Sequence, residues 1–525
     1  MSKPYQPSAR RIPELNGVRV ILVFIVSWYH FWQQSWLTPY VGTYSLDFLV
    51  RSGYAPVDGT ILLSGFLLFL PYARTMLLDE PMPSAKKFYQ RRIMRIVPSF
   101  YFVTLLTLFV VALPWNLYRS STPAMVKDLT AHLTFTHTFF RQTYLYTNLG
   151  GVTWTLAIEM QAYLLFPLIA RLAMKNTAGT TGFMIAIAWI FRGICLWKMS
   201  SYDMVVNQLP NFLDVYAIGI LSSIAYVKLT QLWQKVKRPL IWEALATALV
   251  VLCVWGLTKV LRAQASSAGH DMLQAGQMMR RTMLTSLLAL VMVALPFALL
   301  PLRFLTGNRV MGWLGAISLN YYLVHQTISV HLKRLHIPPA TSELSAESVT
   351  AYENLNHLWA MFGLPILIGA VVTILALTGI RWLSERAAAK SQQPQKTPLQ
   401  RFRTPLLIVA GVAIFFVAMT VTLMARYGLG PQKAVSMMGQ LVQQTYLGYF
   451  KRFGAPLAEG SFIPNQNRDR TWMYPYTGLC FVISILMATA ITYLIEKPAA
   501  WALGKLFKRL DQIPSPFKRL KKKTT

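Results

Sequence analysis

The sequence predicts an all-α, polytopic membrane protein of about twelve transmembrane helices. Hydrophobic residues make up 54% of the 525 residues and charged residues only 13%, and the mean hydropathy is +0.41. Apolar runs long enough to cross a hydrocarbon core of about 30 Å recur along the chain. The runs begin near Val18, Val57, Ile96, Val152, Thr181, Phe212, Ile241, Met283, Val310, Leu358, Leu406 and Gly478.

The first span, Val18 to Leu37, contains two ionisable side chains, Arg19 and His30. An ionisable residue inside a membrane span is a functional candidate by default. At 100° and 1.5 Å per residue, the two side chains lie about 20° apart around the helix and roughly 16 Å apart along it. One face is therefore predicted to carry a cation at one end and a base at the other. The polar, basic leader before this span lacks a small-residue cleavage site, so we expect a retained anchor.

The basic residues predict the orientation in the membrane. The net charge is +32, and its clusters fall on alternate loops, which the positive-inside rule places in the cytoplasm. Arg262, Arg280 and Arg281 lie on a loop expected outside and are exceptions. The protein is expected in the plasma or inner membrane, and an even span count places both termini in the cytoplasm. The basic tail is expected to contact anionic lipid headgroups and not nucleic acid. The clusters are Arg10 and Arg11; Lys86, Lys87, Arg91, Arg92 and Arg95; Lys228, Lys235, Lys237 and Arg238; Arg401 and Arg403; Lys518, Lys521, Lys522 and Lys523.

Changes in composition along the chain predict four segments. Residues 1–390 hold about ten spans, and the polar segment 391–403 is expected to be a cytoplasmic linker. A two-span segment, 404–500, follows with a long outer loop at about 426–475, and 501–525 form the basic tail. The three cysteines all lie in apolar runs without metal-ligand spacing, so we expect neither a disulfide nor a metal site.

Depth along the helices sorts the polar residues into two layers. At 1.5 Å per residue, His30 is expected to lie about 18 Å above the cytoplasmic end of the first span. Glu159 is expected about 10 Å below the outer end of the fourth span. His30 and Glu159 are therefore predicted to share a level in the outer half of the membrane. Arg19, Arg92 and Arg95 lie at cytoplasmic ends of spans and are predicted to form an inner cationic layer.

Four patterns occur in order along the chain: IPELNGVRVILVFIVSWYHF at 12–31, PVDGTILLSGFLLF at 56–69 followed by RRIMRIVPSFY at 91–101, TWTLAIEMQAYLLFPL at 153–168 and WLGAISLNYYLVHQ at 313–326. Together they resemble the acyltransferase-3 family of integral membrane acyltransferases, which move acyl groups onto sugars and other envelope acceptors. Asn16, Val20 and Thr155 depart from the residues usual in the family. The ending YLIEKPA at 493–499 is also similar to the family's close, although Glu496 before Pro498 is expected to mark a helix end.

The resemblance implies a ten-helix acyltransferase core plus two C-terminal helices. It implies transfer of an acyl group, acetyl being favoured, from cytoplasmic acyl-CoA to a hydroxyl of an envelope carbohydrate, glycolipid or related acceptor, without a permanently bound cofactor. Arginines suit the phosphates of such a donor. A histidine, with an ordinary pKa near 6.5, suits the removal of a hydroxyl proton. His30 is therefore predicted to be the base and Glu159 its orienter or an acceptor clamp.

Several interpretations stay open at this point. The three arginines could be topology residues that snorkel to the headgroups, and His30 could be a buried structural imidazole. Asp58 could cap a helix or bind the acceptor, and His325 could bind substrate or belong to a packing network with its tyrosine neighbours. As an alternative to an enzyme, buried charge and an inner basic layer would also suit an exporter of an anionic or acylated solute.

Overall fold

The computed structural model describes residues 7–41, 43–335, 337–338, 358, 361–373, 375–377, 379–380, 399–445 and 470–512. Over these residues the chain is helical apart from connecting segments and one small hairpin, in which β1 (Tyr40–Val41) pairs with β2 (Tyr44–Ser45). The predicted all-α fold is confirmed.

Ten helices within the described residues are long and apolar enough to cross a membrane. The segment predicted at Val310 is also helical, although it is not among the ten, and the one predicted at Leu358 falls on a shorter apolar helix, Met361–Leu377, part of which lies outside the described residues. The helices are α1 (Glu14–Ser35), α2 (Asp47–Arg51), α3 (Val57–Leu78), α4 (Ala85–Thr107), α5 (Thr122–Leu133), α6 (Arg141–Tyr144), α7 (Trp154–Lys175), α8 (Thr177–Lys198), α9 (Leu213–Trp233), α10 (Pro239–Ala265), α11 (His270–Ala294), α12 (Leu300–Gly307), α13 (Arg309–Arg334), α15 (Leu399–Tyr427), α16 (Pro431–Thr445), α17 (Arg470–Ile491) and α18 (Lys497–Gln512).

Residue contacts divide the chain into two compact units. The larger unit is Tyr5–His331 with Leu479–Thr525 and contains both cavities described below. The smaller unit is Leu332–Gly478 with Met1–Pro4. In the smaller unit α15 and α16 pack through an apolar cluster. The buried members of that cluster are Phe362, Met419, Leu423, Ala434, Met438 and Leu441.

Glycines bring α3 and α9 into close contact at the centre of the larger unit. A Cβ atom on Gly219 would lie 2.7 Å from the backbone nitrogen of Phe66, and one on Gly65 would lie 3.2 Å from the Tyr216 ring. Small residues at helix crossings allow backbones to approach, which is a main source of attraction between helices in lipid. The glycines therefore fix the position of α3, which lines the inner cavity.

Two buried ion pairs tie α3, α8, α9 and α11 together. Arg281 Nε donates to Asp58 at 3.0 Å, and Arg192 Nη2 donates to Asp214 at 2.6 Å. Both arginines also donate to the backbone carbonyl of Asn211. Asp58 follows the first residue of α3 but makes no capping hydrogen bond, so the helix-cap interpretation is wrong and the side chain instead neutralises Arg281.

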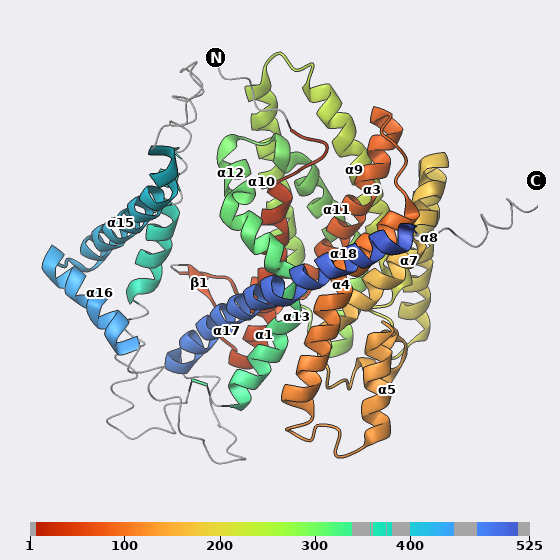
Figure 1. Ribbon diagram of the computed structural model, residues 1–525, viewed down its shortest axis with the longest axis horizontal. Coiled ribbons are helices and arrows are strands. Elements are labelled where there is room, and N and C mark those ends of the chain that lie inside the picture. The colour runs from red at the N-terminus through yellow and green to blue at the C-terminus, as the bar shows by residue number, and fades with distance from the viewer. Residues whose placement is uncertain are drawn as a thin grey trace, which may run out of the picture. The chain divides into compact units, whose positions relative to one another are not determined.

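The last helix continues through Glu496 and does not end there. A π-helical turn, η9 (Thr492–Glu496), joins α17 to α18, and Figure 1 shows α18 lying across α4, which it contacts. Pro498 lacks an N–H group and its ring crowds the carbonyl four residues earlier, inside this wider turn. The π turn accommodates the proline without stopping the helix, so the predicted helix end is wrong.

This C-terminal segment packs directly against α1 and α13. The Phe481 ring lies 5.8 Å from that of Phe24 and 4.9 Å from that of Phe31. Asn320 Nδ2 donates to Glu496 at 2.6 Å and to Thr492 at 2.8 Å. The residues from Leu479 onward therefore belong to the bundle that contains the cavities.

Candidate active site

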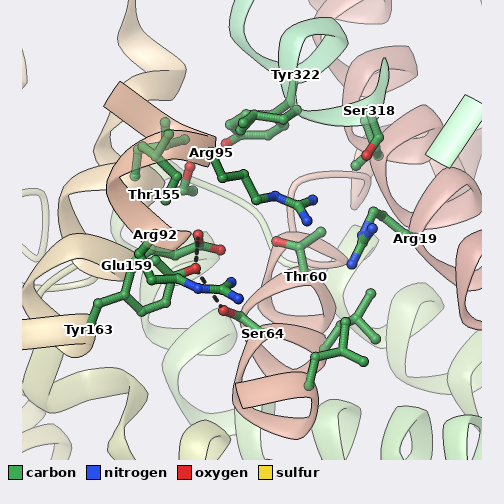
Figure 2. Close-up of a pocket in the computed structure, with 16 residues that line it drawn as sticks. Arg19, Thr60, Ser64, Arg92, Arg95, Thr155, Glu159, Tyr163, Ser318 and Tyr322 are labelled. Atoms are coloured by element: carbon green, nitrogen blue, oxygen red, sulfur yellow. Dashed lines mark hydrogen bonds between the residues drawn. The ribbon is translucent and has the colours of Figure 1, made fainter. Parts of the chain in front are cut away.

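An inner cavity of about 170 Å³ lies between α1, α3, α4, α7 and α13. Arg92 and Arg95 are three residues apart, so they share a face of α4, and Figure 2 shows their guanidinium groups and that of Arg19 directed into the same space. The three arginines predicted to form the inner cationic layer therefore all line this one cavity. Its polar lining is Arg19, Thr60, Ser64, Arg92, Arg95, Thr155, Glu159, Tyr163, Ser318 and Tyr322.

These three arginines have no acidic partner within 4 Å among the described residues, unlike Arg192 and Arg281. Arg92 lies over the rings of Phe88 and Tyr163, with its guanidinium carbon 5.8 and 5.7 Å from the ring centres. Arg19 and Arg92 are half-buried and Arg95 is exposed. Ionisable side chains that lack a partner within membrane helices mark ligand or ion sites. The cavity is therefore suited to an anion.

Glu159 belongs to a chain of polar contacts on one side of this cavity. Tyr163, one helical turn later in α7, donates its hydroxyl to Glu159 Oε2 at 2.7 Å. The Tyr163 hydroxyl also lies 3.0 Å from Ser64 Oγ of α3 (Figure 2). This chain fixes the Glu159 carboxylate beside the arginines.

Removing the Tyr163 hydroxyl tests the importance of this chain. Hydrogen bonds to charged groups contribute about 1.5–3 kcal/mol, so we expect Tyr163→Phe to slow the expected acyl transfer by about 10- to 150-fold in a steady-state assay. Tyr101→Phe, which removes a hydroxyl that donates to the Leu133 carbonyl, serves as the control. Equal activity of the two variants would show that the Glu159 position does not matter.

A second, outer cavity of about 220 Å³ contains His30. At its edge, Asp203 Oδ1 lies 2.6 Å from His270 Nε2 and 2.8 Å from Gln274 Nε2. Hydrogen bonding, first from His270 and then from Gln274, holds the pKa of Asp203 below its ordinary value. The lining combines aromatic rings with neutral amides, which suits a polar, uncharged ligand. It consists of Val26, Tyr29, His30, Tyr54, Val57, Trp154, Val206, Asn207, His270, Leu273, Gln274, Gln277 and Tyr322.

Gln33 orients the His30 ring. Gln33 Nε2 donates to the Tyr29 hydroxyl at 2.7 Å, which turns its Oε1 toward His30 Nδ1 at 3.0 Å. An amide oxygen only accepts, so Nδ1 carries the proton in this arrangement and Nε2 keeps its lone pair. Gln326 Nε2 lies farther away, 3.4 Å from Nδ1. His30 is therefore in the tautomer that a base acting through Nε2 requires.

The structure does not place His30 and Glu159 in one cavity, contrary to the prediction. Glu159 lines the inner cavity with the arginines, and His30 lines the outer one. The helical rise gives the depth of a residue but not the direction in which its side chain points around the helix axis. Glu159 points to Tyr163 and α3. Gln33, and not Glu159 as predicted, is the residue that contacts and orients the His30 ring.

Asp58 and His325 line neither cavity. Both are fully buried: Asp58 pairs with Arg281, and His325 Nδ1 lies 2.7 Å from the Tyr322 carbonyl. The His325 ring packs 5.2 Å from that of His30. Direct contact of either residue with a substrate in these two cavities, as predicted, has no support in this geometry, because neither side chain lines them. His325 belongs to the packing network behind His30.

A family model of the acyltransferase domain matches residues 12–379, more than half of the chain. The chain belongs to the acyltransferase-3 family. It is an integral membrane protein of a family whose model describes an acyltransferase domain. No solved structure matches the chain.

Two curated relatives of this acyltransferase-3 protein are acetyltransferases by name. It is 27% identical over 236 residues to the protein named "Putative acetyltransferase ORF330" of Acidianus two-tailed virus; the match covers 44% of this chain and 62% of the viral protein. It is 29% identical over 182 residues to the O-acetyltransferase OatA of Staphylococcus aureus, which covers 32% of this chain and 26% of OatA. The chain thus spans less than two thirds of the length of either relative.

Sequence reasoning missed several polar residues at the two cavities. Gln33 lies three residues after His30 on the same helix, and Tyr163 lies four after Glu159, so helical spacing alone could have found both. Nothing in the sequence indicates the Ser64 contact, which joins two helices 99 residues apart. Within the described residues no group of three or more His, Cys, Asp or Glu is arranged to hold a metal ion.

Proposed function

We propose that this enzyme transfers an acyl group, acetyl in the simplest case, from acyl-CoA to a hydroxyl of an envelope carbohydrate or glycolipid. The observation that carries this proposal is the set of three guanidinium groups without acidic partners around the inner cavity. Coenzyme A carries phosphates at one end and the thioester at the end of a long, thin arm. Arginine forks bind phosphate in a bidentate manner, so the phosphate end is expected at Arg19, Arg92 and Arg95.

The chemistry follows from the free Nε2 atom of His30. The acceptor oxygen attacks the thioester carbonyl while His30 Nε2 takes the hydroxyl proton. Collapse of the tetrahedral intermediate breaks the carbon–sulfur bond, and the imidazolium returns the proton to the departing thiolate. Gln33 at Nδ1 keeps the ring in the required tautomer throughout. The products are an ester on the acceptor and free coenzyme A.

The outer cavity supports a carbohydrate acceptor. Tyr29, Tyr54 and Trp154 offer rings against which a sugar can pack, and Asn207, with the nearby glutamines, offers amides for its hydroxyls. A glycolipid acceptor could enter the same cavity from the membrane. The acetyl group is supported by the names of the two relatives.

The charge distribution supports a cytoplasmic donor. The inner cavity lies near the N-terminal end of α4, where Lys86, Lys87 and Arg91 also cluster. Under the positive-inside rule this end of the bundle faces the cytoplasm. Both termini are then cytoplasmic, and the acceptor reaches His30 from the opposite side.

Donor affinity of arginine variants tests the proposal. Loss of a charge-assisted hydrogen bond costs about 1.5–3 kcal/mol, so Arg92→Ala and Arg95→Ala should each weaken acetyl-CoA binding by about 10- to 150-fold. Arg92→Lys should restore it only in part because a fork becomes a point charge. Arg91→Ala is the matched control, since Arg91 directly precedes Arg92 on the same helix but does not line the cavity. Unchanged affinity in both alanine variants would leave these arginines as topology residues.

A further inference from the structure

Tyr322 of α13 is common to both cavities. It is the one described residue that lines the inner cavity with the arginines and also the outer cavity with His30. The start of α7 lies at the same boundary, because Trp154 lines the outer cavity and Thr155 the inner one. A path from the donor phosphate site to His30 therefore leads past the Tyr322 ring.

Hydrogen bonds hold Tyr322 in this position from two sides. Its hydroxyl donates to the carbonyl oxygen of Val152 at 3.1 Å, which links α13 to the turn before α7. Its own carbonyl lies 2.7 Å from His325 Nδ1. The side chain is only 7% exposed. Rotation of the Tyr322 side chain away from this position would break one neutral hydrogen bond, which is a small cost. The ring is therefore held in place but can still move.

We propose that the Tyr322 side chain is a partition between the donor and acceptor cavities and limits the size of the acyl group that passes. This inference rests on the proposed function for the identity of the donor. With the ring in place, water on the acceptor side does not reach a thioester in the inner cavity. When the ring moves, a short acyl group can reach His30, whereas a longer one is obstructed by the ring and the neighbouring Trp154.

Tyr321 offers a matched control on the same helix. Its hydroxyl lies 2.8 Å from Ser27 Oγ, and its side chain is 1% exposed. It lines neither cavity. Substitutions at 321 and 322 therefore remove similar buried rings and single hydrogen bonds, but only those at 322 open the boundary.

Thiol labelling tests the partition without any donor. Ser64→Cys places a thiol in the inner cavity and Gln277→Cys places one in the outer cavity, and the native cysteines, all buried, give the background in the unaltered protein. With Tyr322 present, a membrane-impermeant maleimide should label the two new thiols from opposite sides of sealed vesicles. With Tyr322→Ala, Ser64→Cys should become labelled from both sides, and with Tyr321→Ala it should not. Two-sided labelling of Ser64→Cys in the presence of Tyr322 would overturn the proposal.

Acyl selectivity tests the size limit. In Tyr322→Ala, transfer from butyryl-CoA relative to acetyl-CoA should rise by about tenfold or more, the usual scale for methylene discrimination. Acceptor-free hydrolysis of acetyl-CoA should also rise, and Tyr321→Ala should change neither ratio. Tyr322→Leu, which preserves more of the packing, replaces the alanine variant if that one fails to fold. An unchanged chain-length ratio in a folded variant at 322 would overturn the size limit.

The two experiments separate the partition from the donor assignment. If the wild-type protein turns over no acyl-CoA but labelling stays one-sided, the partition stands and the donor class is wrong. If acyl-CoA is used but both thiols are labelled from either side, the donor stands and the partition is wrong.

Discussion

His30→Ala is expected to reduce the rate of acyl transfer by about 10²–10⁴-fold, the usual contribution of a positioned general base. The structure leaves Nε2 of this ring free while Nδ1 contacts Gln33. The ring is only half-buried, so its loss removes little packing from the bundle. Transfer of labelled acetyl groups from acetyl-CoA by purified protein in lipid gives the rate, and thermal unfolding monitors the fold.

Two variants separate a chemical role of His30 from a binding role. His30→Gln can still contact Gln326 but has no basic nitrogen, so it should be as inactive as the alanine variant. His270→Ala also alters the outer cavity but should keep most of the activity because His270 already contacts Asp203 at the edge. A near wild-type rate in either His30 variant would end its assignment as the base.

Asp58→Ala is expected to destabilise the fold by about 3–5 kcal/mol, the usual effect of leaving a buried charge unpaired. Arg281 is fully buried and would keep only backbone carbonyls as acceptors. We expect a large drop in the melting temperature and loss of monodisperse protein. If Asp58 instead bound the acceptor, stability would be unchanged and only the KM for the acceptor would rise.

Two further variants check the origin of this loss. Asp58→Leu combined with Arg281→Met removes both charges and should recover part of the stability, because buried pairs can be replaced by apolar residues of similar volume. Asp203→Ala breaks the exposed pair with His270 and should cost less than about 1 kcal/mol. Equal losses for Asp58→Ala and Asp203→Ala would contradict the explanation from burial.

The sequence predicts the helices well because the membrane sets their length. Apolar runs of about 20 residues have few alternatives to a helix in lipid. The inner arginines were also predictable, since Arg92 and Arg95 share a helix face and Arg19 lies near the start of its own span. Their meeting in one cavity required only that α1 and α4 be neighbours of the same α13.

Contacts between distant segments were not predictable from one sequence. Asp58 pairs with Arg281, 223 residues away, and neither position is distinguished by its neighbours. For Glu159, depth was computed from the helical rise, but the direction of the side chain depends on how α7 is turned against α3. His30 was recognised as the candidate base because a histidine in a span is rare, whereas its amide partner Gln33 looked ordinary.

The contact of Phe481 with Phe24 and Phe31 bears on how the protein is made. About 450 residues separate these partners, and at 5–20 residues per second a ribosome needs roughly 20–90 s to cover that distance. During that interval Phe24 and Phe31 lack this partner, although Tyr321 of α13, which stacks on Phe24, is made earlier. The helix that carries both Arg19 and His30 therefore completes its packing only after the C-terminal segment has been made.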